Sequence, residues 1–132
     1  MNKKEQILQT LEKMGFHPEI DDDGDVVVRY QMKNIFVFVG NEEDSYVAVF
    51  LPQFSEIADG EETLVLAVCN KMTREMKMVK IYVDQTFKNV SASCEFFYAN
   101  EEALECCLNK SLNLLGIVRS QFKKHKSELS EE

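Results

Sequence analysis

Apolar positions recur in two different ways along the first half of the chain. In residues 25–31 every second side chain is apolar, which is typical of a strand with one buried face. Residues 35–39 and 46–51 follow as two short runs that are apolar at nearly every position. These three segments predict consecutive antiparallel strands, and the last two need cover on both faces. The functional question is therefore whether the chain's own helices or a partner cover the second face.

Helical periodicity predicts one helix before these strands and one after them. Residues 3–14 place their apolar side chains on one face, and Gly15 and Pro18 end that helix. Residues 61–74 are apolar over much of a helical circumference, which predicts a helix buried on more than one side. Because this middle helix follows the two apolar strands, it is the element best placed to cover their second face or to share it with a neighbour.

The second half of the chain predicts a hairpin followed by a long helix. Residues 76–84 and 89–98 alternate, and the polar face of the last strand should meet water. Asn100, followed by two glutamates, supplies an N-cap and first-turn carboxylates for a helix that runs to about Phe122.

Short turns complete the predicted fold. Residues 16–20 run extended into the acidic turn 21–24, residues 32–34 form the next turn, and Pro52 ends the strand at 46–51. The prediction is a single α+β domain over residues 1–126 with a frayed polar tail at 127–132. It contains an antiparallel sheet of five to six strands and N-terminal, middle and long C-terminal helices, in the order α-β-β-β-β-α-β-β-α.

Composition narrows the classes of partner and the compartment. The formal net charge of −8 argues against nucleic acid, which needs a dense basic surface. The N-terminus lacks the apolar core of a signal peptide, and no apolar run is long enough for a membrane span, so we expect a cytoplasmic protein. The four cysteines show no metal-ligand spacing and are expected to be reduced and mostly buried; they are Cys69, Cys94, Cys106 and Cys107.

The acidic turn near residue 20 has partial resemblance to a calcium loop. Glu19, Asp21, Asp23 and Gly24 fall at positions like the first, third, fifth and sixth of such a loop. The twelfth position would be Tyr30 instead of a bidentate glutamate, and no helix follows. A hairpin turn is the favoured interpretation, with adventitious cation binding as the alternative and no metal site assigned.

Candidate catalytic groups are sparse. The two histidines, His17 and His125, lie at a helix exit and in a basic run, where solvated side chains are expected. The sequence contains no glycine-rich phosphate loop, and Lys80 and Tyr82 are the best of a weak set of polar strand residues. We therefore assign no catalytic residue and no cofactor, and expect no enzyme.

The order of elements, and residues 64–122 in particular, resembles the type III secretion chaperone-like fold. An apolar helix ends in Val-Cys-Asn-Lys-Met around Asn70; a strand, a turn, an alternating strand and an Asn-Glu-Glu helix start follow. Within that fold the chain looks most like the YbjN-like group of bacterial sensory transduction regulators. The resemblance implies no activity or cofactor. It implies a small adaptor or chaperone-type binding module, often dimeric, that holds a partner on its sheet or helix surfaces.

Two functional hypotheses follow. The first is a non-catalytic protein-binding module that pairs with itself, or with a protein or peptide client, through surplus apolar residues; the candidates are Val37, Val39, Val47, Val49, Leu51, Leu64 and Val68. The alternative is a small-molecule binder or enzyme with a pocket between sheet and helices. Four aromatic residues would line that pocket, although they would more commonly fill the core; they are Phe36, Phe38, Phe50 and Phe96.

Overall fold

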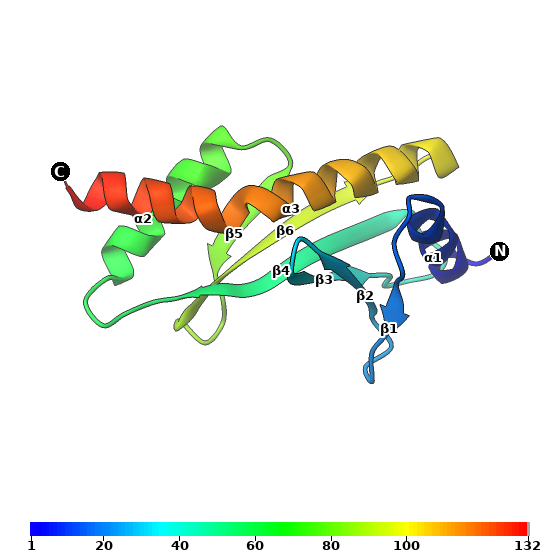
Figure 1. Ribbon diagram of the computed structural model, residues 1–132, viewed down its shortest axis with the longest axis horizontal. Coiled ribbons are helices and arrows are strands. Elements are labelled where there is room, and N and C mark those ends of the chain that lie inside the picture. Colours follow the sequence, from blue (N-terminus) through cyan, green and yellow to red (C-terminus); the bar gives the residue numbers. More distant parts are fainter. Residues whose placement is uncertain (132) are drawn as a thin grey trace.

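A single antiparallel sheet carries the fold (Figure 1). The computed structural model describes residues 1–131. In chain order its elements are α1 (Lys3–Lys13), β1 (Glu19–Ile20), β2 (Val26–Tyr30), β3 (Lys33–Phe38), β4 (Tyr46–Glu56), α2 (Glu62–Glu75), β5 (Val79–Val83), β6 (Asn89–Phe97) and α3 (Glu101–Ser130). The strands lie in the order β1-β2-β3-β4-β6-β5. This confirms the predicted α+β class and the predicted order of elements.

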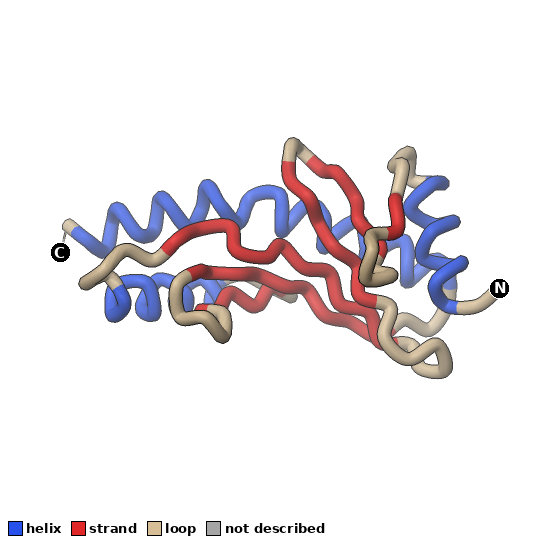
Figure 2. The backbone as a smooth tube through the Cα atoms, turned by 90° about the horizontal axis from the view of Figure 1, so that it is seen from below, coloured by secondary structure: helices blue, strands red, loops and turns tan. Residues whose placement is uncertain are grey.

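All three helices pack on the same face of the sheet. The long α3 lies along the strands and contacts β4, β6 and β5. α1 packs against α3 at one end of the molecule, and α2 packs against α3 and β5 at the other (Figure 1). Viewed from below, the strands lie in front of α3, and no helix crosses in front of them within the described chain (Figure 2). The middle helix therefore does not cover the second face, contrary to the expectation from its composition.

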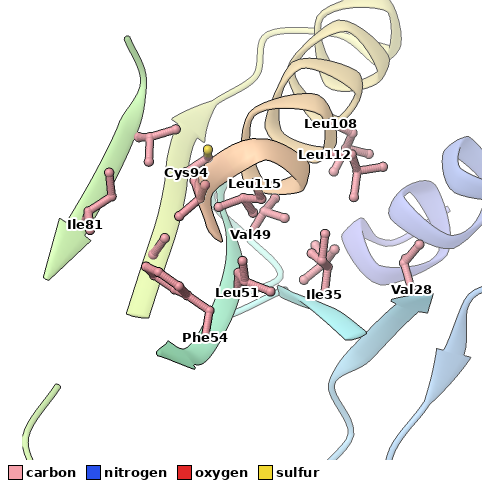
Figure 3. Packing of buried hydrophobic residues seen from close by; sticks show 14 of the residues in the cluster. Val28, Ile35, Val49, Leu51, Phe54, Ile81, Cys94, Leu108, Leu112 and Leu115 are labelled. Atoms are coloured by element: carbon pink, nitrogen blue, oxygen red, sulfur yellow. The ribbon is translucent and has the colours of Figure 1, made fainter. Parts of the chain in front are cut away.

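The core lies between this face and the helices. Strand register sets Val49 opposite Val37 on one side and opposite Cys94 on the other, so that their side chains share a face. Leu108, Leu112 and Leu115 of α3 meet that face from above (Figure 3). A helix with apolar residues at this spacing buries one stripe, and in α3 that stripe runs from Leu104 to Phe122.

Three element boundaries differ from the sequence prediction. The turn between β2 and β3 is the pair Gln31–Met32, so β3 begins earlier than expected. β4 does not end at Pro52, because a bulge between Leu51 and Ser55 lets the strand continue beside β6. α3 runs past Phe122 to Ser130, so most of the expected frayed tail is helical, while residue 132 lies outside the described part.

The outer edge of β5 is closed by α2. The Thr73 hydroxyl accepts a hydrogen bond from the Ile81 N–H at 2.9 Å and donates to the Ile81 carbonyl at 3.1 Å. This one side chain satisfies both peptide groups of Ile81, which an edge strand would otherwise present to another chain. On the neighbouring β6, Ser91 and Ser93 are buried, although their face was expected to meet water. Register places these small side chains between larger ones on β4 and β5, which shield them.

Candidate functional site

The residues nominated from the sequence for partner binding lie in the core. Val37, Val39, Val47, Val49, Leu51 and Val68 are buried, and Leu64 on α2 is half-buried. The strand residues among them point toward the helices, because successive side chains in a strand alternate between faces. A partner does not reach them while α3 stays in place. The apolar residues left for a partner are those at the alternate strand positions, whose side chains point to the other face of the sheet.

Side chains on this other side of the strands form a partly exposed apolar surface, the open sheet face. It consists of Val27, Phe36, Phe38, Tyr46, Phe50 and Phe97, from strands β2, β3, β4 and β6. Phe97 is 73% exposed and Phe38 is 44% exposed. The rings of Tyr46 and Phe97 lie 5.5 Å apart. Of the four aromatic residues proposed to line an internal pocket, three are on this face and only Phe96 faces the helices.

A charged network lies beside these aromatic rings. The Glu95 carboxylate accepts hydrogen bonds from the Tyr46 hydroxyl at 2.7 Å and the Ser93 hydroxyl at 3.2 Å, and it pairs with Lys80. The Lys80 ammonium and the Tyr46 hydroxyl together hold the pKa of Glu95 below its usual range. Partial burial and the nearby carboxylate raise the pKa of Tyr46 to about 12. At neutral pH the network is therefore a carboxylate held by a cation and a protonated phenol.

A second surface opens where β3 and β4 separate. Their pairing covers three residue pairs, from Phe38 opposite Ala48 to Phe36 opposite Phe50, and then the β2–β3 hairpin diverges (Figure 2). Gln53 and Ile57 donate their N–H groups toward β6. Because peptide groups alternate along an antiparallel strand, those of Phe54 and Glu56 point to the side that β3 has left. This part of β4 is an unpaired strand edge within the described chain.

Three adjoining hollows follow this edge and share Arg119 of α3. Their volumes are about 540, 320 and 390 Å³. We call them together the Arg119 groove; its walls are Met32, Lys33, Phe36, Phe54, Arg119 and Lys123. Arg119 and Lys123 form no ion pair within residues 1–131, and Glu56 is the one carboxylate among the described lining residues. In a chain of net charge −8, this groove is locally basic.

Contacts at the tip of the β2–β3 hairpin fix the width of the groove. The Tyr30 hydroxyl donates to Asn113 Oδ1 on α3 at 2.7 Å. A Cβ at Gly116 would lie 2.9 Å from both the Tyr30 ring and the Gln31 side chain, so only glycine allows this approach. Gln31 and Met32 both have positive φ, 49° and 66°, where a two-residue hairpin normally uses Asn or Gly. The strained turn keeps the Met32 side chain 85% exposed at the rim.

The remaining candidates from the sequence are the acidic turn and the cysteines. Carboxylate oxygens of Asp21, Asp23 and Asp25 lie within 4.8 Å of one another, but Asp21 Oδ1 accepts hydrogen bonds from the N–H groups of the other two, as in a turn. All four cysteines are free. Burial raises the pKa of the Cys69 and Cys94 thiols to about 11, which makes them unreactive.

The candidate polar side chains for catalysis have local contacts. His17 is exposed at the exit of α1, while His125 lies on α3 with its Nδ1 3.7 Å from Glu128. Lys80 is held by Glu95 and lies 5.8 Å over the Tyr82 ring. These contacts explain the positions of the side chains as packing and ion pairing.

Comparison with known proteins places the chain in a family. The family of the T3SS (YopN, CesT) and YbjN peptide-binding chaperone 1, TY-Chap1, matches residues 2–103. The chain belongs to the TY-Chap1 family. This confirms the resemblance inferred from the sequence. The family is one of peptide-binding chaperones, which agrees with a protein or peptide client.

A solved structure supports the fold of this TY-Chap1 member. The crystal structure of YbjN from E. coli has a TM-score of 0.70 over 93% of each chain, at 10% sequence identity. The match to the crystal structure of an uncharacterized protein from Methanothermobacter thermautotrophicus covers 97% of this chain and 94% of that chain, at 13% sequence identity and with a TM-score of 0.47. No curated protein matches the sequence. Among the described helices, none combines the length and apolar character needed to cross a membrane.

The sequence predicts the open sheet face and the Arg119 groove only in part. The two apolar runs indicated an unsatisfied second face, and that face exists. The strand residues expected there from the sequence lie on the face that meets the helices, and a run apolar at every position carries no signal for which side that is. The groove depends on the bulge after Pro52 and on Gly116. Neither feature predicts a binding surface from the sequence alone. The isolated Gly116 in a long helix was the one available signal.

Proposed function

We propose that this chain is a non-catalytic, chaperone-type adaptor that binds peptide segments and works as a homodimer in the cytoplasm. The observation that carries the proposal is the open sheet face, where aromatic side chains of three strands lie without cover from any helix in the described chain. A monomeric protein of this size rarely leaves such a contiguous apolar patch exposed unless it is a contact surface. The free cysteines are in keeping with a reducing compartment.

The shape of the open sheet face favours a second copy as its occupant. Its residues span neighbouring strands at about 4.8 Å spacing, so the apolar patch is roughly 15 Å wide. One extended peptide would cover about a third of that width, whereas another sheet can stack on it at about 10 Å. Two copies related by a two-fold axis would place Phe38 and Phe97 of each chain against the same face of the other.

Charge gives this dimer a recognisable salt dependence. Each copy carries a net charge of −8, so two copies repel each other at low ionic strength. The contact itself is apolar. Salt therefore screens the repulsion between the two copies without weakening the apolar contact. Dimer affinity should therefore increase from low to moderate salt. A dimer held by ion pairs would show the opposite trend.

The test is the solution mass by analytical ultracentrifugation over a concentration series. The wild-type chain should approach twice its monomer mass of 15.2 kDa. Phe97→Ser should sediment as a folded monomer with an unchanged circular dichroism spectrum. Leu66→Ser is the matched control, because Leu66 is 57% exposed but lies on α2; it should remain dimeric. A monomeric wild type, or dissociation by the control and not by Phe97→Ser, would contradict the proposed dimer.

The internal-pocket alternative gains no support from this arrangement. Three of the four phenylalanines proposed to line the pocket lie on the open sheet face, and one of these, Phe36, also borders the Arg119 groove. The fourth, Phe96, is part of the buried core. A non-catalytic role therefore agrees better with the positions of these aromatic residues.

A further inference from the structure

The Arg119 groove differs from the open sheet face in shape and in charge. It is an open cleft between the β2–β3 hairpin, β4 and α3, bordered by the strand edge at Phe54 and Glu56. We propose that it binds an extended peptide segment in which apolar side chains alternate with carboxylates. This inference rests on the proposed peptide-binding function and specifies its client.

The backbone edge favours an extended client. Peptide groups that no other strand pairs with are a template for one more strand. Pro52 stands where β3 leaves β4, and its missing N–H means that the free edge begins only beyond it. The peptide groups of Phe54 and Glu56 are then available to hydrogen-bond an incoming strand in register.

Apolar side chains line the groove on two sides. Phe54 is held edge-on against Phe122, with ring centroids 5.4 Å apart, and forms the floor. Met32 forms part of the opposite wall, and its flexible thioether can adapt to different apolar partners. An extended peptide presents every second side chain to one side, so its apolar residues can meet this floor and wall.

The charges favour carboxylates at the alternate positions. Lys33, Arg119 and Lys123 line the groove, and the latter two have no carboxylate partner within the described residues. A guanidinium binds a carboxylate through two parallel hydrogen bonds, which gives such a client both affinity and orientation. Glu56, at the end of the groove, would disfavour a carboxylate only near that position.

Binding of three fluorescent peptides of about ten residues tests the proposal by anisotropy. One alternates Val with Glu, one Val with Lys, and one Val with Ser. The Val/Glu peptide should bind wild type at least about tenfold more tightly than the other two, and its affinity should fall as salt is raised. Arg119→Ala should lose about tenfold in affinity for Val/Glu. Arg74→Ala should lose none, because Arg74 is exposed on α2.

Amide exchange shows where the peptide lies. On saturation with Val/Glu, the amides of Phe54 and Glu56 should become protected from hydrogen exchange, while that of Ile81, already bonded to Thr73, should not change. Protection of β5 alone would place the client elsewhere and overturn the proposal. An equal loss of affinity for the Val/Glu peptide in Arg119→Ala and Arg74→Ala would overturn the proposal as well.

The peptide series separates this inference from the proposed function. Tight binding of Val/Ser or Val/Lys, unaffected by Arg119→Ala, would refute the acidic-client inference and leave peptide binding intact. Binding of none of the three would refute the acidic client, and a dimeric wild type would then support only the self-association part of the proposed function.

Discussion

Adjacent residues on β3 should respond in opposite ways to a negative charge. Val37 is fully buried against the helices, whereas Phe38 lies on the open sheet face and is 44% exposed. Val37→Asp removes about 2 kcal/mol of apolar burial and also places an unpaired carboxylate in the core. The combined loss should exceed about 4 kcal/mol, a large part of the roughly 5–15 kcal/mol that stabilises a typical domain.

Phe38→Asp should lower the free energy of unfolding much less than Val37→Asp does. Its side chain is nearly half exposed, the new carboxylate stays in contact with water, and the loss should be about 1 kcal/mol. Because β3 is the same strand in both variants, strand propensity and local sequence are closely matched. The contrast therefore reports the face on which each side chain lies.

Urea unfolding followed by far-ultraviolet circular dichroism measures both losses, and low protein concentration keeps dimerisation out of the comparison. The chain contains no tryptophan, so tyrosine fluorescence serves as the second probe. If Val37→Asp does not fold, Val37→Ala gives the measurable value, a loss of about 2 kcal/mol, against less than about 1 kcal/mol for Phe38→Ala. Equal losses at the two positions would refute the one-sided arrangement of the helices.

Three further variants test the supports of the two surfaces. Gly116→Val should clash with Tyr30 and Gln31, lowering the free energy of unfolding by about 1–3 kcal/mol in urea titration and weakening Val/Glu binding. Thr73→Val leaves the edge of β5 unsatisfied and should cost about 1–3 kcal/mol, with faster amide exchange at Ile81. Glu95→Gln should destabilise the chain at neutral pH. The folded-state pKa of Glu95 is depressed, so the stabilisation by its ionised form is present above the ordinary value of 4.5 and is lost as pH falls through the folded value. Thermal melts of both proteins should therefore converge in acid, and a gap that widens in acid would contradict this.

Sequence patterns predicted the helices and strands well where residues close together in the sequence determine them. The strand expected at residues 89–98 and the cap at Asn100 both match the structure, since the side chain of Asn100 accepts from the Ala103 N–H at 2.8 Å. Boundaries failed where tertiary contacts decided them. β4 passes Pro52 because β6 continues to pair with it after the bulge, and Leu129 packs against the core near the end of α3.

For the candidate site, the sequence predicted only that a second apolar face of the sheet needs to be covered. Residues 35–39 and 46–51 indicated two apolar faces, and the structure has two, of which α3 covers one. Which parity faces α3 depends on how the sheet docks on a helix more than fifty residues later in the chain. Single-sequence periodicity contains no information on that docking. The Arg119 groove is still harder to predict, because its walls come from a hairpin, a bulge and a helix that only the folded chain brings together.

Hydroxyl-radical footprinting at two protein concentrations tests the central claim most directly, namely that the open sheet face is a contact surface. At low concentration, Phe38 and Phe97 should both be oxidised, because both are exposed in the single chain. At high concentration the oxidation of both should drop severalfold, while Leu66 on the far side stays as reactive as before. Protection of Leu66 with unchanged oxidation of Phe38 and Phe97 would contradict the account, since the chains would then associate through their helices.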